Sequence, residues 1–174
     1  MARLFDKDGN EITPKVPPMS DLVHIGELGG EFEECTVSIS FYSENLDRHK
    51  ITQMLGVDPT KAWNAGEKYP VGNEKSGKFM MQDWGQWILK SEVRDNNPEN
   101  QTVFLLGRCS QDLDLWKQLA SEYDATLSIT AYAHNWNREL RLSSNIMGML
   151  AERGLELWID AYFEDEEEGI EQEN

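Results

Sequence analysis

Polar and apolar side chains alternate along several segments of the chain. In residues 35–43, Val37, Ile39 and Phe41 alternate with serine, threonine and tyrosine. This period of two is typical of a β-strand that buries one face and exposes the other to water. The pattern predicts strands over residues 35–43, 82–93, 125–133, 138–143 and 155–163, with a further short strand over residues 60–66.

Three other segments carry apolar residues at helical spacing. They are residues 43–56, 110–123 and 143–154. The first and last end at Gly56 and Gly154, and a glycine after the last apolar residue is a common helix stop. Between the strand at 82–93 and the helix at 110–123, the segment NNPENQT at residues 96–102 predicts a break in the chain.

The order of these elements predicts an α+β fold, in which a mainly antiparallel sheet carries helices on one face. A doubled ferredoxin-like unit is an alternative, because a helix with an Ile–Met-Leu core and a glycine stop occurs twice. We expect an N-terminal leader over residues 1–31, a single domain over residues 32–163 and a disordered acidic tail over residues 164–174. In the leader, Asp8 and Gly9 favour a hairpin turn.

The predicted strands place polar and aromatic residues on the face opposite the helices. Three helices are too few to cover both sides of such a sheet, so we expect this face to be open, or covered by the leader or a second molecule. Tyrosine, tryptophan and arginine beside small hydroxyls are typical of protein-binding surfaces. The candidate binding residues are Tyr42, Trp84, Tyr132, Arg141, Trp158, Asp160 and Tyr162. For Asp160, an ion pair with Arg141 or Arg138 is the structural alternative.

The segment GVDPTKAWNAGEKYP at residues 56–70 has the composition of a functional loop. A structural explanation is favoured, because Gly56 ends a helix and Pro59 prevents the helix from restarting. Trp63 and Tyr69 are kept as loop candidates, because they would lie close to the open face of the sheet.

The net charge is unusual, with 16 basic against 32 acidic residues and a balance of −16. Residues 164–174 contain seven acids and no base. These seven acids account for less than half of the excess negative charge, so the predicted domain is acidic as well. Such a field repels nucleic acids and anionic membrane surfaces and attracts basic partners. We therefore expect no binding of nucleic acid or membrane, and a basic protein as the partner.

The sequence contains none of the common catalytic or cofactor motifs. There is no phosphate-binding glycine loop and no G-x-S-x-G motif. His24, His49 and His134 are isolated from one another, so neither a metal nor another cofactor is expected. Cys35 and Cys109 are interpreted as buried small hydrophobes without a disulfide. No run is long enough for a membrane helix or signal peptide, so a cytoplasmic location is expected.

The arrangement of several segments resembles a known family. These are VSISFYS…ITQMLGVDPTKAWNAGE, WGQWILKSE and LRLSSNIMGMLAERGLELWIDAYF. Together they resemble the bacterial family catalogued as domain of unknown function 4279, over about residues 35–163. The resemblance implies a bacterial, cytoplasmic α+β protein and assigns no catalytic residues. Small acidic proteins with this layout are similar to the immunity proteins of bacterial toxin systems.

We therefore expect a non-enzymatic binding protein, of the immunity type, that neutralises a basic bacterial toxin by direct contact. Two alternatives belong to other classes. One is a domain that binds or processes a small ligand or nucleotide in a pocket near Asp160 and Trp63, with Tyr162 as a third lining residue. The other is a structural homodimer whose open faces pack together.

Overall fold

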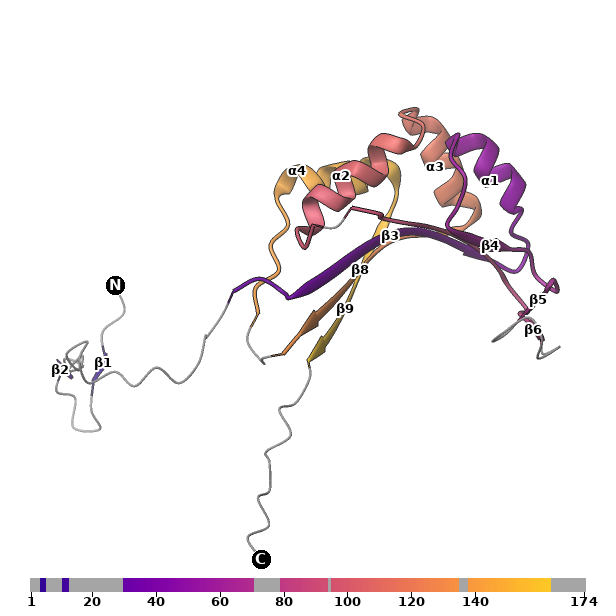
Figure 1. Ribbon diagram of the computed structural model, residues 1–174. Coiled ribbons are helices and arrows are strands. Elements are labelled where there is room, and N and C mark those ends of the chain that lie inside the picture. The colour runs from indigo at the N-terminus through magenta and orange to yellow at the C-terminus, as the bar shows by residue number, and fades with distance from the viewer. Residues whose placement is uncertain are drawn as a thin grey trace, which may run out of the picture.

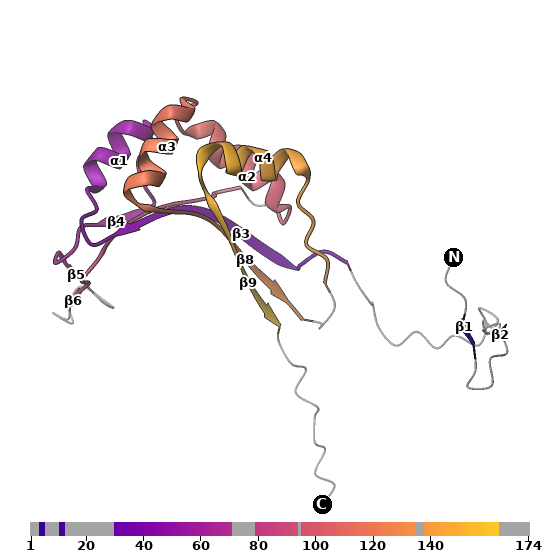
Figure 2. The same ribbon diagram turned by 180° about the vertical axis from the view of Figure 1, so that it is seen from behind.

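The computed structural model describes residues 4–5, 11–12, 30–70, 79–93, 95–134 and 138–163. In this part of the chain, helices α1 to α4 form one layer and a five-stranded sheet forms the other. Both views show all four helices on the same side of the sheet (Figures 1 and 2). The predicted α+β architecture, with helices on one face only, is therefore confirmed.

The main sheet has the strand order β4-β7-β3-β8-β9. Its strands are β3 (Glu34–Ser43), β4 (Lys61–Trp63), β7 (Gly85–Lys90), β8 (Asp124–Ala133) and β9 (Glu156–Phe163). All neighbours are antiparallel except β8 and β9, which are parallel. Two small antiparallel pairs lie outside it: β1 (Leu4–Phe5) with β2 (Glu11–Ile12), and β5 (Lys68–Pro70) with β6 (Phe79–Met81). The predicted turn at Asp8 and Gly9 lies outside the described residues.

Each of the four helices starts at a residue whose side chain accepts hydrogen bonds from the first free backbone N–H groups. The helices are α1 (Arg48–Leu55), α2 (Pro98–Arg108), α3 (Leu113–Glu122) and α4 (Ser144–Arg153). Their caps are Asp47, Asn97, Asp112 and Ser143. As predicted, α1 and α4 stop at Gly56 and Gly154, which both have φ = 70°. None of the helices described here is long and apolar enough to cross a membrane.

Two details differ from the sequence-based expectation. The segment predicted as a chain break contains the start of α2, because Pro98 follows the cap Asn97 and occupies the first turn, where its missing N–H costs nothing. Residues 138–143 were expected to form a strand but join no ladder. The edge of β8 that they would need is occupied by β9. The short strand predicted within residues 60–66 is present as β4.

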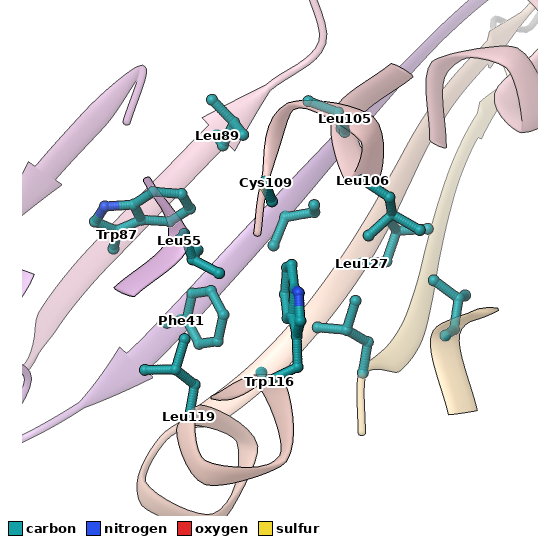
Figure 3. Close-up of a cluster of buried hydrophobic side chains, with 14 of the residues drawn as sticks. Phe41, Leu55, Trp87, Leu89, Leu105, Leu106, Cys109, Trp116, Leu119 and Leu127 are labelled. Atoms are coloured by element: carbon teal, nitrogen blue, oxygen red, sulfur yellow. The ribbon is translucent and has the colours of Figure 1, made fainter. Parts of the chain in front are cut away.

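The core lies between the sheet and the helix layer. On β3 and β8, Val37 pairs with Ile129 and Ile39 with Leu127, and all four side chains are fully buried. Figure 3 shows Phe41 at the centre of this core. Its ring centroid lies 5.7 Å from that of Trp87 and 6.2 Å from that of Trp116. Both tryptophan N–H groups have partners: Nε1 of Trp87 donates to Thr52 Oγ1 (3.0 Å) and Nε1 of Trp116 to the Ser110 carbonyl (2.7 Å).

Cys35 and Cys109 are free thiols buried in this core. Burial raises the pKa of each thiol from 9.0 to about 11, because the charged thiolate is poorly solvated there. Both cysteines therefore pack as small hydrophobes, as the sequence suggested.

Beyond the end of β7, the side chain of Gln101 on α2 makes the hydrogen bonds to β3 that a neighbouring strand would make. Ser38 is the last residue of β3 that pairs with β7. Beyond it the Ser91 N–H still donates to the Val37 carbonyl (2.9 Å), but the Val37 N–H and the Cys35 carbonyl bond to Gln101 instead of a strand. Oε1 of Gln101 accepts from the Val37 N–H (2.9 Å), and its Nε2 donates to the Cys35 carbonyl (2.8 Å). One buried side chain amide thus continues the hydrogen bonding of the central strand and joins α2 to it.

Replacing Gln101 with leucine should destabilise the protein by about 1–3 kcal/mol, because two buried backbone groups lose their partners. Urea denaturation measures this difference. The matched control is Gln118→Leu on α3, an exposed amide that bonds only to Glu122 in the described part of the chain. The control should change stability by no more than about 0.5 kcal/mol. Equal losses in the two variants would contradict the role given to Gln101.

Candidate binding surface

The face of the sheet opposite the helices has no layer of described residues over it (Figures 1 and 2). We call it the open face. Its centre is formed by three directly opposed pairs of Ser and Thr residues on β3 and β8, which we call the hydroxyl floor. These pairs are Thr36–Thr130, Ser38–Ser128 and Ser40–Thr126. Because these side chains are small and carry hydroxyl groups, the centre of the open face is flat and polar.

Part of the hydroxyl floor is shielded from water although no second layer covers it. Ser40 is 2% exposed and Thr126 is 1% exposed. Their row continues through larger neighbours, Ile88 on β7 and Glu156 on β9. The Oγ1 atom of Thr126 has no hydrogen-bond partner among the described residues. The hydroxyl floor is therefore partly buried, and the exposed side chains of the open face lie around it.

Three aromatic side chains lie beside the floor on β8 and β9, and we call them the aromatic rim. Tyr132 and Tyr162 are opposite each other in the parallel ladder, and their rings stack with centroids 5.1 Å apart. Trp158 lies two positions from Asp160 on the same face, and its Nε1 donates to Glu156 Oε2 (3.3 Å). Tyr132, Trp158 and Tyr162 are 44%, 51% and 52% exposed. Large rings that are half exposed and close together are suited to burial against a partner.

The other predicted face residues are spread more widely. Asp160 is exposed and lies opposite Thr130. Tyr42 is half-buried and lies between Gln86 and Asp124. Trp84 is exposed but precedes β7, so it belongs to no ladder of the main sheet.

Trp63 has a structural role. Its side chain is buried, its Nε1 donates to the Trp84 carbonyl (3.2 Å), and the Lys61 ammonium lies 5.0 Å from its ring centroid. Tyr69 lies on β5 opposite Met80, and its side chain is outside the described part of the structure.

The strand order separates Trp63 from Asp160. Trp63 is on β4 and Asp160 is on β9, which are the two edges of the main sheet. Four interstrand steps of about 4.8 Å place the two strands roughly 19 Å apart. A single small-ligand pocket lined by both residues is therefore not formed.

Arg141 lies on the segment 138–143 and not on the sheet. It forms an exposed ion pair with Glu139 at 3.0 Å. Arg138 forms a forked contact with the carboxylate of Glu33, in which Nε lies 3.1 and 3.3 Å from the two carboxylate oxygens. Asp160 makes no ion pair with any described residue, so the predicted alternative of pairing it with Arg138 or Arg141 is wrong.

A pocket of about 330 Å³ lies at the end of the sheet where β3 begins, next to the first turn of α2. Sequence reasoning did not predict it, because its walls come from three separate segments. Its lining residues are Glu31, Phe32, Cys35, Asn96, Asn97, Pro98, Glu139, Leu140 and Arg141. Of its charged side chains, Arg141 pairs with Glu139 and Glu31 adds a second acid, and the pocket does not include the aromatic rim.

No group of three or more His, Cys, Asp or Glu side chains within the described ranges could hold a metal ion. His49 is on α1 and His134 directly follows β8, while His24 lies outside the described residues. The aromatic rim, at one side of the open face, is the candidate binding site.

These features describe an α+β domain with one uncovered sheet face. The model of the family named domain of unknown function DUF4279 matches residues 33–164, and the chain belongs to this family. Neither a curated protein nor a solved structure gives a significant match.

The Glu33–Arg138 contact makes stability depend on pH. The guanidinium hydrogen bonds lower the pKa of Glu33 from 4.5 to about 2. A carboxylate with a lowered folded-state pKa stabilises the fold above about pH 4.5, and this contribution is lost as the pH falls towards 2. Glu33→Gln should therefore lower the urea midpoint at neutral pH, with a difference from wild type that shrinks below about pH 4.5.

The matched control is Glu44→Gln, in the exposed turn after β3. It should change the urea midpoint little across the same pH range. A Glu33→Gln difference that stays constant down to about pH 3 would contradict the ion pair as its cause.

Proposed function

We propose that this protein is a non-enzymatic binding protein of the immunity type, which neutralises a basic bacterial toxin by direct contact through its open face. The observation that carries the proposal is the aromatic rim, three half-exposed rings gathered on one side of an acidic, uncovered sheet face. Tyrosine and tryptophan are the residues that most often dominate binding energy at protein interfaces, because they bury a large area with few rotatable bonds.

The charges of the open face support a basic partner. Its acids lie on the half of the face built by β3, β8 and β9. Three of them, Glu34, Glu156 and Asp160, adjoin the aromatic rim, and the fourth, Asp124, lies at the other end of β8; all are exposed. The exposed bases Lys61 and Lys90 are on β4 and β7, on the other half. A basic surface would therefore be attracted towards the rim, where the aromatic rings can be buried.

The net charge of −16 adds attraction at longer range. Such a field accelerates the encounter with a basic protein, and short-range contacts then determine how long the complex lasts. Charge and rings thus have different roles: the acids should control the association rate and the rings the dissociation rate.

The test uses the products of the genes adjacent to that of this protein, because toxin and immunity genes are normally neighbours. A basic product that arrests growth of a test host should be neutralised by co-expression of the full chain. Its association rate with the purified chain should fall about 10-fold or more between roughly 0.05 and 0.5 M salt. The variant with Tyr132, Trp158 and Tyr162 all changed to serine should bind about 30-fold more weakly.

The matched control is Phe104→Ser, which removes an exposed ring from α2 on the helix side. This variant should bind and protect as wild type does. Either of two results would overturn the proposal: no adjacent product is bound and neutralised, or the rim variant binds as tightly as the control. Circular dichroism of each variant establishes that it is folded.

A further inference from the structure

The two edges of the main sheet differ strongly. At one edge, β4 has only three residues and includes Lys61, and short strands with lysine are common protection against unwanted strand pairing. At the other edge, β9 has eight residues, ELWIDAYF, with no lysine, arginine, proline or glycine. It pairs with β8 on one side, and no described residue pairs with its other side. A long strand of this kind is a template for pairing with another chain.

β9 also leaves large apolar side chains uncovered on both of its faces. Trp158 and Tyr162 belong to the open face, while Ile159 and Phe163 point to the side of the helices. Ile159 and Phe163 are 47% and 46% exposed, whereas Ile129, opposite Ile159 on β8, is fully buried. The helix-facing side of β8 is therefore buried along its length, by the helices and, at Ala131 and Ala133, by Phe32 and Leu140, whereas that of β9 is covered only in part. Side chains of an added strand would bury apolar area on both faces at once.

The charges on β9 decide between possible occupants. Glu156 and Asp160 lie on its open-face side, and the sequence continues directly into the acidic residues 164–174. An antiparallel pair of two β9 strands centred on Asp160 sets two carboxylates opposite each other. One centred on Trp158 sets Glu156 opposite Asp160 twice, whereas one centred on Ile159 sets no two acids opposite each other. Like charges directly opposite are destabilising, so the acids oppose two registers of pairing with a second copy, whereas they attract a basic strand.

We propose that β9 binds an extended segment of a basic protein by strand addition, with the segment becoming the sixth strand of the sheet. The segment has basic residues facing Glu156 and Asp160 and apolar residues facing Leu157 and Ile159, so it alternates between the two types. Backbone hydrogen bonds supply affinity, and the alternate side chains supply specificity. This inference rests on the proposed function and specifies the part of the partner that binds, an extended strand.

The test uses the full chain and a labelled eight-residue peptide in which lysine alternates with valine or isoleucine. We expect binding by fluorescence anisotropy, with slower amide hydrogen exchange at residues 156–163 and no change at residues 61–63. Two further peptides have the same side chains, but each is N-methylated at the alternate amides along one of its two edges. At least one of them should bind about 10-fold more weakly, or weaker still, because its methylated edge cannot donate hydrogen bonds to β9. This peptide control leaves the protein unaltered.

Two protein variants complete the test. Ile159→Lys puts a positive charge on the helix-facing side of the edge, where the peptide is apolar, and should weaken peptide binding about 10-fold or more. Glu152→Lys on α4 is the matched control: it introduces a lysine at an exposed residue outside β9 and should bind the peptide nearly as wild type does.

Three results would overturn strand addition: no peptide binding, binding of both N-methylated peptides as tight as that of the unmodified peptide, or binding without protection of β9. If the adjacent gene product still binds the rim in any of these cases, the proposed function stands and only the binding mode fails. A dimer in sedimentation experiments, with β9 protected in the absence of peptide, would show that a second copy is the occupant.

Discussion

The pairing of β3 with β8 is the constraint on which the rest of the structure depends. Val37 faces Ile129 and Ile39 faces Leu127, so every apolar position of one strand meets an apolar position of the other. A slip of the register by one residue would place serines and threonines under the helices and the apolar side chains in water. Because the core helices pack only on the apolar side, this one register fixes which face is covered and which face is open. The same alternation of faces continues from β8 into β9, and it places the three rings of the aromatic rim on the open face.

The open face combines a rigid centre with exposed margins. Opposed Ser and Thr side chains are compatible with β-structure and occupy little height above the sheet. Burial of Thr126 Oγ1 without a partner among the described residues has a cost in free energy, and the packed core on the other side of the strand offsets it. Larger side chains lie where strands end or at the edge strand β9. The side chains available for recognition are therefore concentrated at the margin of the open face next to β9, beside the hydroxyl floor.

Much of the fold could be predicted from the sequence, because periodicity reports which side of a strand or helix is buried. The position of Trp158 and Tyr162 on the open face followed from alternation, whereas the similar exposure of Ile159 and Phe163 on the helix-facing side did not, because β9 is an edge strand that the helices cover only in part. Three features differ from the prediction, and two of them depend on which segments become neighbours. The third is local: Pro98 starts a helix where the sequence suggested a break, and its cap Asn97 is the signal for that start. Residues 138–143 alternate, but β9 occupies the edge of β8 beside which they were expected to lie, so Arg141 is not on the sheet. The separation of Trp63 from Asp160 requires the strand order, which periodicity does not contain.

The acidity of the chain and the exposure of β9 are best explained together. A long apolar edge is a hazard for a soluble protein, because identical copies can pair through it. Glu156 and Asp160 place like charges opposite each other in two registers of self-pairing, whereas a basic strand turns the same charges into attraction. Since screening confines such effects to about 8 Å at physiological salt, the acids on β9 itself select the strand and the distant acids mainly guide the encounter. One distribution of charge thus discourages the wrong partner and recruits the right one, which is why removing the acids would weaken specificity more than the stability of the fold.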